Sequence, residues 1–179
     1  MRFEGKIYIP NKSFLNLSDS QKWYWSGLIL LIIFCFLAIV NQDNWKNDLL
    51  DTIFKVCCFI SLGIFALGKL GAIGSSEKLN GKLDGTIKIN TEFIEIKSER
   101  YNIKDIKMLN LTLKDFWDKY EHPGPNYVGP WYMAGINNKI EFKYLNKNVS
   151  TQFRIDLEED FINLKNIKKE LKNTIDNNV

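Results

Sequence analysis

The chain has 179 residues, of which 45% are hydrophobic, and a formal net charge of +3. This length suits one compact domain with accessory segments and excludes two domains with full cores, because domains commonly run to about 100–150 residues. The weak basic charge argues against nucleic-acid binding, which needs a stronger basic bias.

The N-terminal part of the chain holds two long apolar runs. Residues 23–41 carry no charge, and residues 52–73 carry only Lys55 and Lys69, which lie close to the two ends of that run. A helix of about 20 apolar residues crosses a hydrocarbon core of about 30 Å, and lysines near its ends can extend to the headgroups. Aromatic side chains, which favour membrane interfaces, flank the first run at Trp23, Tyr24, Trp25 and Trp45. We therefore predict an integral membrane protein with two transmembrane helices joined by a short external loop.

Two other interpretations of these runs are less favourable. A cleaved signal peptide would have a shorter apolar region and an earlier start, and residues 38–42 offer no small-x-small cleavage pattern. A buried helix of a soluble core is conceivable for the second run, which is the weaker span, but the adjacent first run favours a membrane hairpin.

The lysines and arginines predict how the hairpin is oriented. Basic residues precede the first run and follow the second, whereas the connection holds Lys46 among three aspartates. By the positive-inside rule, the N-terminal segment 1–22 and the domain 78–179 both face the cytoplasm, and the protein is a multi-pass protein of the inner (cytoplasmic) membrane. The basic residues that carry this prediction are Arg2, Lys6, Lys12, Lys22, Lys69, Lys78 and Lys82.

Beyond residue 78 the pattern changes to alternating polar and apolar residues. Such alternation predicts strands, here at residues 86–89, 93–96, 105–113, 139–144 and 149–155. We expect these strands to form an antiparallel meander. The side chains predicted to point inward in the last three strands are Leu109, Leu111, Leu113, Ile140, Phe142, Tyr144, Thr151, Phe153 and Ile155.

The end of the chain has a helical period instead. One amphipathic helix is predicted to cover one end of the sheet. The residues of its inner stripe are Leu157, Phe161, Leu164, Ile167, Lys168, Leu171 and Ile175. The predicted fold is therefore a membrane α-hairpin plus an α+β soluble domain.

Three segments resemble the opening strands of bacterial PH-like domains, many of which are joined to transmembrane helices. They are Gly85–Ile89, Phe93–Ile96 and Tyr101–Ile106. The resemblance covers residues 81 to about 173 and implies an antiparallel PH-like β-barrel or sandwich capped by one C-terminal helix. It implies a scaffold rather than an activity, because this superfold hosts lipid, peptide and protein recognition alike.

The sequence gives little support to catalysis. His122 is the only histidine, and Cys35, Cys57 and Cys58 all lie within the apolar runs. No phosphate-binding glycine motif is present, so neither a triad, a metal site nor a nucleotide site is indicated. We expect a protein that is not an enzyme and that uses no cofactor.

Residues 115–138 form an unusually long connection between predicted strands, and such connections are often functional. Its aromatic residues favour a loop that recognises a partner or touches the membrane, since Trp and Tyr dominate binding hot spots and interfacial belts. The alternative is a lid whose rings pack on the sheet. The candidate recognition residues are Asp115, Trp117, Tyr120, Tyr127, Trp131, Tyr132 and Asn137.

Two functions follow as hypotheses. In the first, the chain is a non-enzymatic, membrane-tethered PH-like module that recognises a protein or the membrane surface. In the second, the helix hairpin itself acts as a membrane subunit for complex assembly or immunity, through small residues of the second run. Those residues are Ser61, Gly63, Ala66, Gly68 and Gly71. The expected partners are the lipid bilayer and either another protein or a second copy of the chain.

Overall fold

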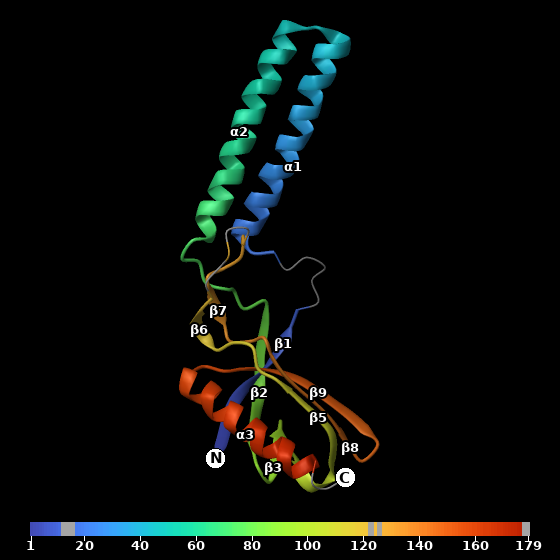
Figure 1. The fold of residues 1–179 in the computed structure, drawn as a ribbon, viewed down its shortest axis with the longest axis vertical. Helices are drawn as coiled ribbons and strands as arrows, with labels where there is room; N and C mark the ends of the chain where they lie inside the picture. The colour runs from blue at the N-terminus through green and yellow to red at the C-terminus, as the bar shows by residue number, and fades with distance from the viewer. Residues whose placement is uncertain (12–16, 122–123, 125–126, 177–179) are drawn as a thin grey trace. The chain divides into compact units, whose positions relative to one another are not determined.

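The computed structural model of the chain describes residues 1–11, 17–121, 124 and 127–176. These residues form two compact units (Figure 1). The sheet unit comprises Met1–Phe14, Lys78–Glu121 and Tyr132–Val179, and the helical unit comprises Leu15–Glu77 and His122–Trp131. Lys12 and His122, which entered the sequence analysis, lie outside the described residues.

The helical unit is a helix hairpin. It consists of α1 (Asp19–Val40), the π-helical turn η1 (Asn41–Trp45) and α2 (Asp48–Ala72). Both helices are long and apolar enough to cross a membrane, and most of their large apolar side chains are exposed. Each begins four residues earlier than predicted, because Ser18 and Asn47 accept hydrogen bonds from the backbone N–H groups of Gln21 and Leu50.

Small residues bring the two helices together. A Cβ atom at Gly27 would lie 2.4 Å from the backbone nitrogen of Phe65, and one at Gly68 would lie 2.3 Å from that of Tyr24. Ser61 is also buried, whereas Gly63 has open space around it. Glycine therefore permits backbone contact at two levels of the hairpin, as small residues do between membrane helices.

A buried asparagine closes the far end of the hairpin. The side chain of Asn41 donates to the carbonyl of Asn47 at 2.9 Å and accepts from the N–H of Asn47 at 3.3 Å. Lys46, between them in the chain, adopts a left-handed conformation with φ 47°. One side chain thus satisfies the backbone where the chain reverses, which buried backbone groups require.

The helix pairing makes a direct prediction for the native cysteines. The Sγ atoms of Cys35 and Cys58 lie 3.6 Å apart across the hairpin, so a small shift brings them to the bond length of about 2.05 Å. Copper-phenanthroline oxidation of the full chain should yield a Cys35–Cys58 linked peptide by mass spectrometry. The control Cys58→Ala retains Cys57 and should yield little intramolecular product; equal linkage through Cys57 would contradict the observed helix register.

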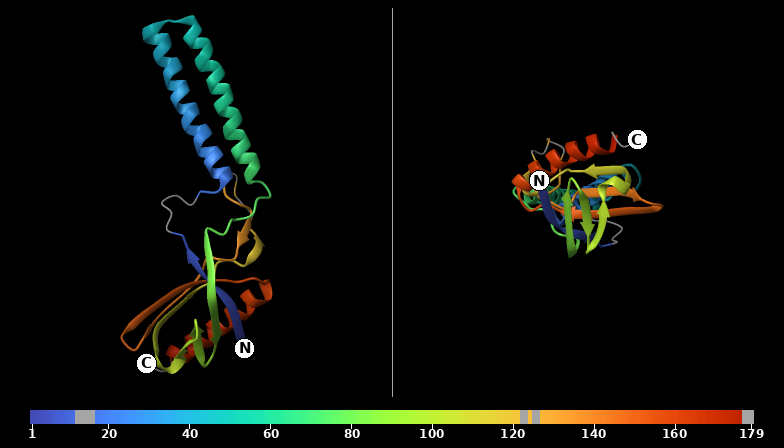
Figure 2. Two further views of the ribbon diagram at one scale, coloured as in Figure 1. Left: turned by 180° about the vertical axis from the view of Figure 1, so that it is seen from behind. Right: turned by 90° about the horizontal axis from the view of Figure 1, so that it is seen from below.

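The sheet unit is built on seven antiparallel strands in the order β4-β3-β2-β1-β9-β8-β5. Figure 2 shows this sheet from two further sides. A separate two-stranded sheet pairs β6 with β7, and the 3₁₀ turn η2 (Ile103–Asp105) precedes β5. The strands are β1 (Arg2–Pro10), β2 (Gly81–Asn90), β3 (Phe93–Ile96), β4 (Glu99–Asn102), β5 (Ile106–Thr112), β6 (Trp117–Tyr120), β7 (Tyr132–Ala134), β8 (Asn138–Tyr144) and β9 (Lys147–Arg154).

The main departure from the sequence prediction is β1. The N-terminal segment was predicted only as a cytoplasmic extension, yet residues 2–10 pair with β2 on one side and with β9 on the other. Phe3 and Ile7 are 1% and 2% exposed, so this strand supplies core side chains as well as hydrogen bonds. The sheet unit therefore includes residues from before the hairpin, and a boundary at residue 78 leaves out one of its central strands.

The hairpin is consequently an insertion between two neighbouring strands. Pro10 is paired with Gly81, and the N–H of Asn11 donates to the carbonyl of Asn80 at 2.9 Å, which continues the ladder one step further. The chain leaves β1 and returns to β2 at the same end of the sheet. We refer to this end as the linker end.

Most of the predicted strands are confirmed, and the differences in their first and last residues have local causes. The strand predicted at residues 105–113 is interrupted by a bulge between Lys107 and Asn110, where Met108 has φ 55° and is 82% exposed. Leu111, Ile140, Phe142, Phe153 and Ile155 are buried as expected. The strands that were not predicted are β1, β4, β6 and β7.

The closed barrel implied by the resemblance is corrected by an open sheet. β4 and β5 are the two edge strands and are not paired with each other. The sheet is nonetheless strongly curved. Tyr101 on the edge strand β4 stacks edge-on against Phe142 and Tyr144 on β8, with ring centroids 5.2 and 5.1 Å apart, although β3, β2, β1 and β9 lie between β4 and β8 in the sheet order.

The C-terminal helix α3 (Glu158–Asp176) covers the sheet as predicted. Its inner stripe of Phe161, Leu164, Ile167 and Leu171 is buried in the same core as Phe3 and Phe153. Leu157, predicted to face inward, is instead 59% exposed, because it precedes the first residue of the helix; Lys168 is also exposed. The side chain of Ile175 lies outside the described part of the chain.

Candidate functional site

The predicted recognition loop is not a loop throughout. Its two ends form the β6–β7 hairpin of the sheet unit, in which Trp117 pairs with Ala134 and Tyr120 with Tyr132. Of the seven candidate residues, five belong to the sheet unit at this hairpin or its base: Asp115, Trp117, Tyr120, Tyr132 and Asn137. The other two, Tyr127 and Trp131, belong to the helical unit.

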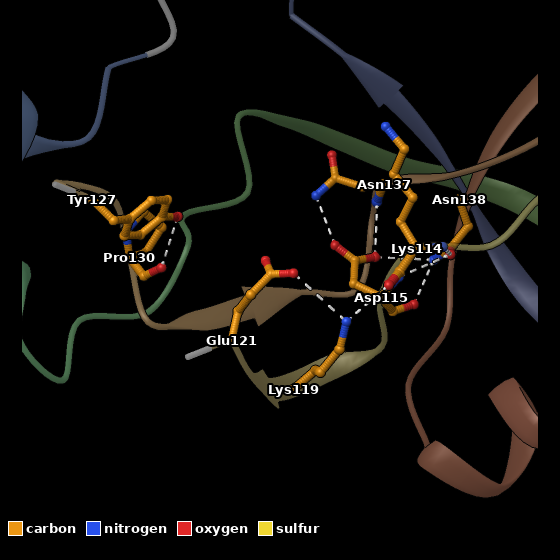
Figure 3. A network of polar contacts seen from close by, with 8 residues as sticks. All are labelled: Lys114, Asp115, Lys119, Glu121, Tyr127, Pro130, Asn137 and Asn138. Atoms are coloured by element: carbon orange, nitrogen blue, oxygen red, sulfur yellow. Dashed lines mark hydrogen bonds and ion pairs between the residues drawn. The ribbon is translucent and has the colours of Figure 1, made fainter. Parts of the chain in front are cut away.

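A buried asparagine organises the base of the β6–β7 hairpin (Figure 3). Asn138 has no exposed surface, and its amide nitrogen donates to the carbonyls of Gly135 at 2.8 Å and Asp115 at 2.9 Å. Its amide oxygen accepts from the backbone N–H groups of Lys114 at 2.9 Å and Asp115 at 3.3 Å. This one side chain therefore joins the segment that precedes β6 to the segment that follows β7.

Asp115 completes this network. It is 3% exposed, and its two carboxylate oxygens accept from the backbone N–H of Asn137 at 3.1 Å and from the Asn137 side chain at 2.7 Å. Burial raises the pKa of Asp115 above its usual range, while the hydrogen bonds from Asn137 oppose that rise. Asp115 and Asn137, two of the candidate residues, thus have a structural contact with each other.

Gly135 allows the hairpin to approach the rest of the sheet unit. Its φ is 71°, a conformation that favours glycine. A Cβ atom at Gly135 would lie only 2.4 Å from the carbonyl oxygen of Ile155, which excludes larger residues. Its carbonyl accepts from the N–H of Ile155 at 2.9 Å, and the carbonyl of Ile155 accepts from the N–H of Trp117 at 2.8 Å. The hairpin is therefore tied to the segment between β9 and α3.

The β6–β7 hairpin combines buried residues with exposed aromatic rings. Ala134, in β7, and Ile136, which follows it, pack with Tyr8 and Leu83 near the linker end of the sheet. Trp117 and Tyr120 are 42% and 47% exposed. The two interpretations of the loop thus apply to different residues of it, because Ala134 and Ile136 are packed whereas Trp117 and Tyr120 are half-exposed.

The exposed rings are held in place by their neighbours. The guanidinium carbon of Arg154 lies 4.2 Å from the centroid of the Trp117 ring, a cation–π arrangement. The rings of Tyr120 and Tyr132 lie 5.6 Å apart. Such positioned, half-exposed aromatic side chains are suited to contact, because little side-chain entropy is lost on binding.

The helical unit holds the remaining part of the predicted loop. The N–H of Trp131 donates to the carbonyl of Ser75 at 2.9 Å, three residues after α2 ends. The hydroxyl of Tyr127 donates to the carbonyl of Pro130 at 3.1 Å and leaves no space for a side chain at Gly129. This tight turn lies beside the C-terminal end of α2, and we refer to residues 127–131 as the aromatic turn.

The charged surface of the sheet unit is mixed. Several of its lysines are paired with carboxylates, among them Lys88 with Glu95 and Lys97 with Asp84, each at 2.8 Å. Within the described residues, no group of three or more His, Cys, Asp or Glu side chains is placed to hold a metal ion.

Sequence reasoning missed Asn138, Gly135 and Arg154, which position the candidate residues. Asn138 and Gly135 could have been identified from the sequence Gly135-Ile136-Asn137-Asn138, which precedes an alternating run. Gly and Asn in such a position are typical of a chain reversal with hydrogen bonds from side chains to the backbone. Arg154 gives no such signal, because its contact with Trp117 depends on how β9 is placed beside the hairpin.

Comparisons of the chain with protein-family models, with curated proteins and with solved structures found no match.

Proposed function

We propose that this protein is a membrane-tethered, non-enzymatic recognition module, whose sheet unit is a PH-like scaffold held at the cytoplasmic face of the inner membrane. The observation that carries the proposal is the insertion of the apolar hairpin between the paired strands β1 and β2. Both linkers leave the same end of the sheet, so a hairpin in the bilayer would tether the sheet unit by two connections.

The dimensions of the hairpin support a membrane location. α1 has 22 residues and rises about 33 Å, which matches a hydrocarbon thickness of about 30 Å. Its large apolar side chains, such as Ile32 and Phe36 at 61% and 64% exposed, would be costly to leave in water and are favourable in lipid. The distribution of lysines favours cytoplasmic termini.

The PH-like assignment is supported by the order of elements and by curvature. A curved antiparallel sheet is followed by one C-terminal helix that fills its concave side, although the strands leave the sheet open. A scaffold of this kind binds through surface features. Here the exposed rings of Trp117 and Tyr120 are the features that favour recognition.

The alternative function, in which the hairpin acts on other membrane helices, has less support. Of the five small residues that would mediate such contacts, Ser61 and Gly68 are already buried against α1. Gly63 has open space around it and would be the position for a partner helix.

Photo-crosslinking in membranes tests the proposal against this alternative. A benzophenone side chain at Tyr120 should give protein or lipid adducts, whereas one at Glu92, exposed at the opposite end of β2 from the linkers, should give few. Protein adducts from Leu67 of α2, with no adducts from Tyr120, would favour the hairpin function and contradict recognition by the sheet unit. Activity of an export-dependent reporter fused to the C-terminus would contradict the cytoplasmic orientation.

A further inference from the structure

One end of the hairpin carries a concentration of aromatic side chains. The first two turns of α1 contain Trp23, Tyr24 and Trp25, and the first and third of these are 57% and 48% exposed. The same end includes the end of α2, because Gly68 lies against Tyr24 and the Cβ of Ser20 is 4.0 Å from the Cβ position at Gly71.

The aromatic turn lies at this same end of the helical unit. Trp131 is hydrogen bonded to Ser75, and Ser75 is bonded to Ala72, the last residue of α2, through both its N–H at 3.2 Å and its hydroxyl at 2.9 Å. Tyr127 is 41% exposed and Trp131 is half-buried. A segment about fifty residues further along the chain thus returns to the terminus of the second helix.

We infer that the aromatic turn, residues 127–131, is a third membrane anchor, which inserts Tyr127 and Trp131 into the headgroup region of the bilayer that holds the hairpin. This inference rests on the proposed membrane tether and names the lipid surface as the ligand of this segment. Trp and Tyr are favoured at that depth because their rings are apolar while the indole N–H and the hydroxyl can be hydrogen bonded.

The position of the aromatic turn favours lipid rather than protein as its binding partner. Trp23 and Trp25 already mark the interface level at the start of α1, and Lys69 in the last turn of α2 can extend to headgroups there. The turn shares that level through its bonds to Ser75. Its preformed conformation, fixed by the Tyr127 hydroxyl and Gly129, limits the ordering cost of insertion.

Depth-dependent fluorescence quenching tests the inference on the full chain in vesicles of phosphatidylcholine and phosphatidylglycerol. The chain has five tryptophans, and one variant keeps only Trp131, the others being changed to Phe. A second variant keeps only Trp25, and a third has no native tryptophan but carries Glu92→Trp. Lipids brominated near the headgroup end of the acyl chain should remove roughly half of the emission from Trp131 and Trp25, and little from residue 92.

The outcomes separate the inference from the proposed function. Quenching of Trp25 without quenching of Trp131 overturns the anchor and leaves the tether in place. No quenching of Trp25 overturns the tether and the anchor with it. Equal quenching at Trp131 and residue 92 also overturns the anchor, because it would report general proximity to lipid.

A second measurement avoids the tryptophan replacements. In the otherwise unaltered chain, a benzophenone side chain at Tyr127 should form lipid adducts that one at Glu92 does not form. Adducts at Tyr127 with protein only would overturn the inference in favour of a protein partner.

Discussion

A chain that begins at residue 78 is expected not to fold, although it contains the whole predicted soluble domain. It lacks β1, so β2 and β9 lose the strand that joins them, and the core loses Phe3 and Ile7. Loss of a buried Phe and a buried Ile costs about 2–5 kcal/mol each, and together with the two lost ladders this is comparable to the whole stability of about 5–15 kcal/mol that native proteins possess. Circular dichroism during urea titration should show no cooperative transition.

The matched control restores the strand without the hairpin. Joining residues 1–11 to residues 80–179 through a short Asn-Gly linker uses the existing Asn11–Asn80 hydrogen bond to close a tight turn. This linked chain should unfold cooperatively, and Phe3→Ala within it should lower the free energy of unfolding by about 3–5 kcal/mol. A fragment from residue 78 as stable as the linked chain would show that β1 is dispensable.

Replacement of Asn138 by Ala is expected to be the most damaging single change at the β6–β7 hairpin. It would leave the carbonyl of Asp115 and the N–H groups of Lys114 and Asp115 without the Asn138 side chain as partner, at a position with no exposed surface, while the carbonyl of Gly135 would keep only its bond from Ile155. Since each buried unsatisfied group costs about 1–3 kcal/mol and the site can relax in part, we expect a loss of about 4 kcal/mol. Hydrogen exchange of the full chain in detergent should show lost protection across β6, β7 and the start of β8.

Asn137→Ala is the control, because Asn137 is the adjacent amide but is exposed. Its side chain makes a 2.7 Å hydrogen bond to Asp115, for which water can substitute, so a loss of at most about 1.5 kcal/mol is expected. If the two variants lost equal protection, the Asn138 network would not be what holds the hairpin to the sheet.

The parts that could be predicted from the sequence are those in which the pattern is local. Residues 93–96, 139–144 and 149–155 alternate cleanly and become β3, β8 and β9, and the two long apolar runs become α1 and α2. The short strand β4 has no clear strand pattern, because Ser98, Glu99 and Arg100 are all polar and an edge strand tolerates polar side chains.

The parts that could not be predicted depend on partners distant in sequence. β1 has an interrupted apolar pattern, with Gly5 between Phe3 and Ile7, and its neighbours lie beyond the hairpin and near the end of the chain. At the site, the aromatic composition of residues 115–138 indicated contact, but not which rings would be exposed. That division follows from contacts that are distant in sequence, such as those of Ala134 and Ile136 with Tyr8 and of Arg154 with Trp117.

The insertion of the hairpin between β1 and β2 also has a consequence for the order of folding. During synthesis β1 is made first, but β2 follows only after both helices, and β9 later still, so Phe3 must wait for Phe153, whose ring lies 5.6 Å away in the finished sheet. Closing so long a loop is entropically costly and slows folding. An assembled helix hairpin would bring together beforehand the two ends of the connection between β1 and β2, because Ser20 and Gly71 are neighbours. Insertion of the helices would then act as the nucleation step for the sheet, and a chain that fails to insert would leave its first strand without a partner.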